Sequence, residues 1–370
     1  MGLTPEPRQA GRDRLAFGAF LRVICLLFLT ACSTAADKGA AGQRRGSGVG
    51  PSGDTSDDSG GVPSALLEHA RECAAELGPP PAWDILADSL DVPITVDGVP
   101  LQGDAWHSAV TCDRPDLLQR SCVPHTRVGW KQGTTTEGED DPDVDWVITF
   151  RRDDPTTGPG LGRYHDVAMI GHRVSTGATC FFQAFPNATV ARVPSPIEAA
   201  DVAPAGEPGP SEFWNLPSST AGIDCIRCHG ADPWIHSPWV DQLRHPDDDS
   251  RPYVPSGADP DRPYWVVGTA FSEWNDQLHH IRPEGNDCVS CHRIGVRESC
   301  ERLVVYATGN VGGLPMSETG SAFPMSHWMP PASASNEAEW DAAWADDVQA
   351  LLVCCRGPET EGCGLSAVPR

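Results

Sequence analysis

Basic residues are scarce in this 370-residue sequence. Lys and Arg total 27 against 51 Asp and Glu, and the formal net charge is -24 at pH 7. Because a nucleic-acid-binding protein uses Lys and Arg to neutralise phosphates, we do not expect a nucleic-acid partner. An acidic surface either only keeps the protein solvated or also attracts a partner with a basic docking surface, and both interpretations stay open.

A long apolar segment is also missing near the N-terminus. The apolar run at residues 23–29 is too short for a membrane-spanning helix, which needs about 20 such residues. Four arginines precede the run: Arg8, Arg12, Arg14 and Arg22. Basic residues followed by a short apolar run indicate a secretory signal. We therefore expect residues 1–31 to be a signal peptide and the chain to be exported.

The signal ends in the sequence L-T-A-C at residues 29–32, which resembles a bacterial lipobox. The resemblance implies cleavage before Cys32 and lipidation of its thiol. An ordinary signal peptide with an incidental cysteine is the alternative. Because Ser33 is not Asp, similarity to enterobacterial sorting implies an anchor in the outer membrane, facing the periplasm or the cell surface. Residues 32–62 are Gly, Ser, Ala and Asp with almost no apolar content, so we expect a disordered tether.

Two C-x-x-C-H motifs, at residues 225–229 and 288–292, carry the chemistry of the chain. Two thiols one helical turn apart can add to the vinyl groups of one porphyrin, and the adjacent His then reaches the iron. A zinc site usually needs a second C-x-x-C or an H-x-x-x-H pair, and a disulfide leaves the His unexplained. We expect two covalent haem c groups, held by Cys225, Cys228, His229, Cys288, Cys291 and His292.

These ten residues resemble the motifs of bacterial di-haem and multihaem c-type cytochromes. The resemblance implies that haem is attached outside the cytoplasm, in keeping with the export signal. It is specific for the cofactor and carries little information on a substrate.

The other cysteines indicate disulfides. Besides Cys25, Cys32 and the motif cysteines, the sequence contains Cys73, Cys112, Cys122, Cys180, Cys300, Cys354, Cys355 and Cys363. An even number in an exported chain favours disulfide bonds. Four precede the first motif and four follow the second, so we predict two bridges on each side, with the pairings left open.

Local patterns predict an α+β fold. Residues 63–210 are expected to form a small β-rich domain, with a helix over 64–77 and strands over 92–98, 144–150, 166–174 and 179–185. Residues 211–370 are expected to form a mainly α or irregular cytochrome c-like di-haem domain. Its clearest element is a helix over 336–353, with Asn336 and Glu339 placed as in a capping box.

Each iron can take a second protein ligand, usually His or Met. Between the motifs there are four histidines and no Met, and His236 is the first choice there over His245, His279 and His280. After the second motif, the M-P-P sequence at 329–331 resembles the distal Met loop of small c-type cytochromes. Met329 is therefore the first choice for the second iron, with Met325 and His327 next, unless it is only a core residue.

The favoured function is an electron-transfer lipoprotein of the bacterial cell envelope that exchanges electrons with a redox partner protein. One alternative is a di-haem oxidoreductase, such as a peroxidase, with one open iron site. Di-haem peroxidases usually separate their motifs further than this chain does, which counts against that family. A partner-binding or sensing module with supporting haems is the third possibility.

Overall fold

The structure is a computed structural model. It describes residues 64–101, 107–108, 112–116, 121–152, 164–186, 190–199, 202–255, 259, 261–300, 304, 328–330 and 333–370. The predicted signal peptide, tether and lipidation site at Cys32 lie outside these residues. The chain divides into two compact units, Met1–Asp57 and Asp58–Arg370, and everything described below belongs to the second. Among the described residues, no helix is both long and apolar enough to span a bilayer.

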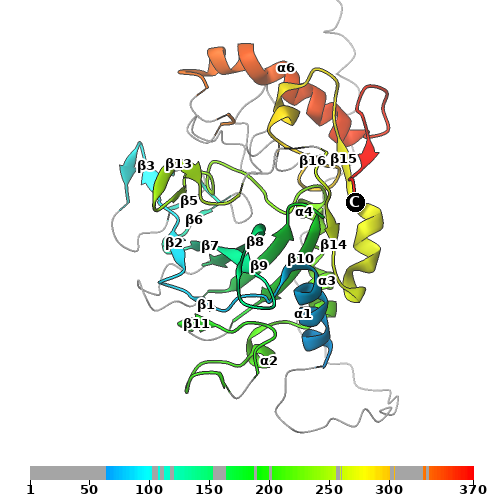
Figure 1. The fold of residues 1–370 in the computed structure, drawn as a ribbon. Helices are drawn as coiled ribbons and strands as arrows, with labels where there is room; N and C mark the ends of the chain where they lie inside the picture. The colour runs from blue at the N-terminus through cyan, green and yellow to red at the C-terminus, as the bar shows by residue number, and fades with distance from the viewer. Residues whose placement is uncertain are drawn as a thin grey trace, which may run out of the picture. The chain divides into compact units, whose positions relative to one another are not determined.

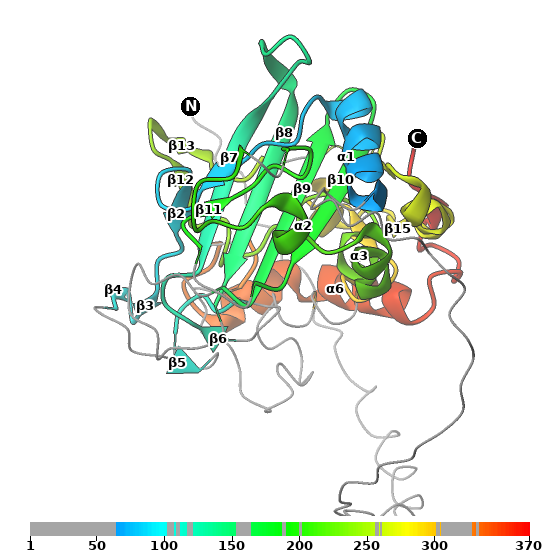
Figure 2. The same cartoon turned by 90° about the horizontal axis from the view of Figure 1, so that it is seen from below.

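A six-stranded sheet with the order β14-β10-β9-β8-β7-β2 is the centre of the second unit (Figures 1 and 2). Its strands are β2 (Ser89–Asp91), β7 (Arg127–Thr134), β8 (Asp140–Arg151), β9 (Asp166–Arg173), β10 (Ala178–Ala184) and β14 (Trp265–Val266). All neighbours are antiparallel except β10 and β14, which are parallel. The strands predicted over 144–150, 166–174 and 179–185 are confirmed as β8, β9 and β10.

Short elements surround the sheet. Before the first motif they are α1 (Ser64–Leu77), β1 (Trp83–Asp84), β3 (Thr95–Val96), β4 (Val99–Pro100), β5 (His107–Ser108), β6 (Ser121–Cys122), β11 (Arg192–Val193), α2 (Pro210–Phe213) and α3 (Pro217–Ile223). From the first motif onward they are α4 (Ile226–His229), β12 (Arg244–His245), β13 (Asp248–Pro252), the 3-10 helix η2 (Thr269–Gln277), β15 (His279–Ile281), the 3-10 helix η3 (Asp287–Ser290), β16 (Ile294–Gly295), α6 (Glu337–Arg356) and β17 (Ser366–Ala367).

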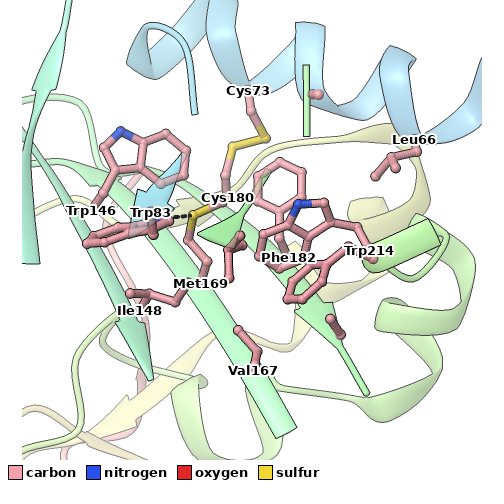
Figure 3. Packing of buried hydrophobic residues seen from close by; sticks show 14 of the residues in the cluster. Leu66, Cys73, Trp83, Trp146, Ile148, Val167, Met169, Cys180, Phe182 and Trp214 are labelled. Carbon is pink, nitrogen blue, oxygen red and sulfur yellow. Dashed lines mark hydrogen bonds between the residues drawn. A yellow bond between two sulfur atoms is a disulfide. The ribbon is translucent and has the colours of Figure 1, made fainter. Parts of the chain in front are cut away.

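One face of the sheet is covered by α1. The helix buries Leu66, Ala70, Cys73 and Leu77, whose spacing places them on one side, and it ends at Gly78 with φ 75°. Alternate strand residues such as Trp146, Met169 and Phe182 meet it (Figure 3). A disulfide from Cys73 to Cys180 joins the helix to β10. The helix predicted over 64–77 is confirmed.

The opposite face carries the part of the chain that contains the motifs. Phe181 of β10 packs with Ile226, Phe271 and Trp274, while Val147 of β8 belongs to a cluster with Trp239. Both faces of β10 are therefore covered, and all its residues are buried.

The α+β class is confirmed. The predicted division at residue 210 stays a prediction, and it lies within the unit Asp58–Arg370. The strand β14 comes after the first motif and pairs with β10 through Ala178 and Thr179. The sheet and the motif region thus share one core.

The C-terminal helix α6 confirms the helix predicted over 336–353 and continues to Arg356. The Asn336 Oδ1 atom accepts a hydrogen bond from the Glu339 amide at 3.1 Å. The Glu339 carboxylate binds Ser335 instead of the Asn336 amide expected in a capping box.

Disulfides connect residues in both the N-terminal and the C-terminal parts of the described chain. The four bridges are Cys73–Cys180, Cys112–Cys122, Cys300–Cys355 and Cys354–Cys363. Two precede the first C-x-x-C-H motif and two follow the second, which confirms the predicted distribution. The last two hold the end of α6 to residues 300 and 363.

Candidate functional site

The first motif forms the short helix α4 and the residue before it. The amides of Cys228 and His229 both bond to the Cys225 carbonyl, at 3.1 Å and 2.9 Å. This turn begins directly after Asp224, which takes a left-handed conformation (φ 63°) at the end of α3. The backbone therefore holds the two cysteines and the histidine within a single turn, as their spacing predicts.

Apolar side chains hold this turn against the sheet. Ile226 is fully buried, and Cys225 packs against the same cluster. The Phe181 ring of β10 meets the His229 ring edge-on, with 5.8 Å between centroids, and Trp274 lies against Phe181 at 5.6 Å. One side of the first motif is consequently packed against apolar and aromatic residues that lie far from it in sequence.

The tautomer of His229 follows from its hydrogen bond. Its Nδ1 atom lies 3.0 Å from the Pro233 carbonyl oxygen. Because a carbonyl only accepts, Nδ1 carries the proton and Nε2 keeps its lone pair. Burial lowers the pKa of His229 to about 4, so the ring is neutral at pH 7. A neutral ring whose second nitrogen is held by a carbonyl is the form in which histidine binds a metal.

The second motif begins in η3 and repeats the same backbone turn. The His292 amide bonds to the Cys288 carbonyl at 3.0 Å. Asn286 caps the turn by accepting from the Cys288 amide at 3.1 Å, and its side-chain amide donates to the Asp347 carbonyl of α6 at 2.7 Å. This single asparagine joins the motif to the C-terminal helix.

Cys288 lies between two buried clusters. One contains Trp328, Trp340 and Leu352, and the other contains the disulfide cysteines Cys300, Cys354 and Cys363. Burial raises the pKa of Cys288 to about 12. Burial also lowers the pKa of His292, and the neighbouring charge of His236 lowers it further.

The eight described cysteines outside the motifs are all in disulfides, while Cys225, Cys228, Cys288 and Cys291 are thiols. Burial raises the pKa of Cys225 to about 12, whereas Cys291 is exposed. Among the described cysteines, those of the two motifs are therefore thiols and those outside the motifs form disulfides.

Three ion pairs connect the motifs to each other, and sequence reasoning missed them. Residues following the second motif pair with residues around the first, in the combinations Arg293–Asp232, Arg297–Asp224 and Arg227–Glu298. The only sign of these pairs in the sequence is that charged residues near the first motif and after the second motif have opposite signs. Local patterns cannot match partners this far apart.

The distal-ligand candidates divide into described and undescribed residues. His236 hydrogen-bonds through both ring nitrogens, from Nδ1 to Asp241 at 2.7 Å and from Nε2 to the Pro255 carbonyl at 3.2 Å. Although burial opposes it, the Asp241 carboxylate raises the pKa of His236. Its Nε2 atom has to leave Pro255 before it can bind iron.

Met329 lies on the side of the second motif. Its carbonyl accepts a hydrogen bond at 2.9 Å from the indole of Trp340, in the cluster that borders Cys288. The runners-up Met325 and His327 lie outside the described residues. Of the other histidines, His280 binds Ser366 at 2.7 Å and His245 packs on Trp130.

No group of three or more His, Cys, Asp and Glu side chains within the described ranges is arranged to hold a metal ion. A haem iron receives four ligands from the porphyrin and needs at most two from the protein, so this observation does not bear on haem. No protein-family model matches the sequence, and no curated protein or solved structure matches the chain.

The thiol environments predict an order of alkylation in protein made without haem. Iodoacetamide at pH 8 should modify the exposed Cys291 first. Cys225 and Cys288, with pKa values of about 12, present roughly 1000-fold less thiolate than an ordinary cysteine. A thiolate of higher pKa is more nucleophilic, which offsets part of the lower thiolate concentration. We therefore expect Cys225 and Cys288 to be alkylated roughly 30- to 100-fold more slowly than an ordinary thiol. Peptide mapping by mass spectrometry measures the order, and equal rates for Cys288 and Cys291 would contradict it.

Proposed function

We propose that the two C-x-x-C-H motifs each carry one covalent haem c. The observation that carries this proposal is the separation of the cysteines. The motif cysteines are thiols, and the other described cysteines are paired in disulfides. If the chain is exported, as its N-terminal sequence predicts, the pairing of eight cysteines but not of these four supports a separate use for the four.

The residues present fit this cofactor. Cys225 and Cys228 would form the thioether bonds of the first haem, and Cys288 and Cys291 those of the second. The Nε2 atom of His229 has its lone pair available for iron, and His292 holds the corresponding place in the second motif. Bound haem supplies one-electron exchange between ferrous and ferric iron.

Electron transfer in the cell envelope is the function that this arrangement supports best. Each motif lies beside buried aromatic residues, Phe181 and Trp274 at the first and Trp328 and Trp340 at the second. Apolar walls exclude water and hold a redox centre in one setting, as transfer requires. The strongly acidic chain suits a redox partner protein with a basic docking surface. In this proposal residues 211–370 have the cytochrome c-like role.

The first test counts the haems. Protein made with a haem-maturation system should have the mass of the polypeptide plus two haems. Replacing Cys225 and Cys228 with Ala should remove one haem, and replacing Cys288 and Cys291 should remove the other. Intact-mass spectrometry and a haem absorbance assay measure the result. The mass of the bare polypeptide would refute the proposal.

We propose that the protein is anchored by a lipid on Cys32 to the outer membrane, in the periplasm or at the cell surface. The L-T-A-C sequence after the export signal supports this. Cells fed labelled palmitate should label the wild type, whereas the Cys32→Ser variant should stay unlabelled and unprocessed. Equal labelling and an unchanged mature mass in Cys32→Ser would contradict the anchor.

His236 and Met329 are the proposed distal ligands. Because a thioether stabilises ferrous iron, Met329→Ala should lower the reduction potential of one haem and leave the other in place. His236→Ala should alter one haem by loss of a strong imidazole donor. Potentiometric titration of both variants measures these shifts, and two unchanged potentials would show that the ligands are elsewhere. A high-spin ferric haem that binds cyanide in the wild type would favour the oxidoreductase alternative.

A further inference from the structure

The segment after the second motif runs back along the first motif. Arg293 pairs with Asp232, Arg297 with Asp224, and Glu298 with Arg227, so the two stretches meet in opposite directions. Figure 1 places β16 near α4, in agreement with these pairs. The segment after the second motif thus pairs with residues before, within and after the first motif.

Arg293 is the buried member of the set. Only 1% of its side chain is exposed, and it lies 3.6 Å from the Asp232 carboxylate. Its guanidinium also donates to the Arg262 carbonyl and lies over the Tyr264 ring, 5.8 Å from the centroid. Tyr264 in turn donates from its hydroxyl to the His229 carbonyl at 2.6 Å. The residue next to His292 is therefore connected to His229 through Tyr264.

The backbones approach closely at Gly295. A Cβ atom built there would lie 2.8 Å from Ser299 Oγ and 3.5 Å from Ala231 Cβ. Four residues later, the Ser299 amide donates to the Arg227 carbonyl at 3.2 Å. A Cβ at 295 would already touch Ala231 at an ordinary contact distance, so the additional methyl groups of a valine would press on Ala231 without changing any charge.

The Arg297–Asp224 ion pair joins the two stretches through two hydrogen bonds, on the side that is partly exposed to solvent. The two terminal nitrogens of the guanidinium face the two carboxylate oxygens, and the Nη1–Oδ1 distance is 2.9 Å. Such a two-point pair fixes orientation as well as distance. The pair is about 30% exposed, so its energetic contribution is modest and its geometry is the more important property.

We propose that residues 293–299 form a positioning segment that docks the second C-x-x-C-H motif on the first, so that the two haems act as an interacting pair. This inference rests on the proposed function. Arg293, Arg297 and Glu298 are positioning residues and touch no iron. In a weakly screened interior, the charge of one redox centre affects the other, and the effect depends on their separation.

The experiment reverses one charge and then restores the pair. Arg297→Asp sets two carboxylates against each other at Asp224. The double variant Asp224→Arg, Arg297→Asp rebuilds an ion pair with opposite polarity. Arg370→Asp is the matched control, because Arg370 pairs with Asp276 where both side chains are more than half exposed. Haem is counted first in every protein, and electron paramagnetic resonance of the fully oxidised protein then reports the magnetic interaction of the two irons.

We expect an interaction signal in the wild type and in Arg370→Asp, its loss or clear change in Arg297→Asp, and its recovery in the double variant. A second pair of variants covers the case in which Arg297→Asp does not fold. Gly295→Val should change the signal, whereas Gly222→Val should not, because nothing lies within 4 Å of a Cβ at 222. Absence of haem overturns the proposed function. Two haems with a signal that Arg297→Asp and Gly295→Val leave unchanged, or no signal in the wild type, overturn this inference alone.

Discussion

Burial of the central sheet on both faces is the constraint on which the rest of the structure depends. Along β10, Cys180 and Phe182 point toward α1, while Phe181 points toward the first motif. Alternation of side chains in a strand makes this division automatic. Neither cover is optional, because an apolar face without its cover would meet water. The first motif is therefore joined to the core of the unit through the buried side chain of Ile226.

This constraint also explains which features the sequence could predict. The helices over 64–77 and 336–353 and the strands over 144–150, 166–174 and 179–185 follow from periodicity and capping within a few residues. The distribution of disulfides followed from the places of the cysteines relative to the motifs. The pairing of β14 with β10 could not be predicted, because the two strands lie far apart in the sequence and no local pattern shows which strands pair.

The same distinction applies to the candidate site. The C-x-x-C-H spacing predicted that the two cysteines and the histidine of each motif lie within one turn. The hydrogen bond from the His229 amide to the Cys225 carbonyl agrees with this. The spacing could not predict that the Pro233 carbonyl would accept a hydrogen bond from His229 Nδ1 or that Arg293 would reach Asp232. Both contacts depend on how the chain turns after the motif. The hydrogen bonds of His236 to Asp241 and Pro255 could not be predicted either. They depend on the path of the backbone, which residue spacing does not determine.

The bond from His229 to residue 233 has a consequence for how the protein tolerates sequence change. Its acceptor is a main-chain carbonyl, which all twenty amino acids provide. A substitution at 233 therefore leaves the acceptor atom in the chain, and only a change in backbone path can withdraw it. In the proposed haem site, Cys225, Cys228 and His229 offer no such latitude, because their own side chains would hold the haem. The side chain at 233 is thus free to change without removing the hydrogen-bond acceptor that orients the His229 ring, whereas the proposed haem-binding positions are not free to change.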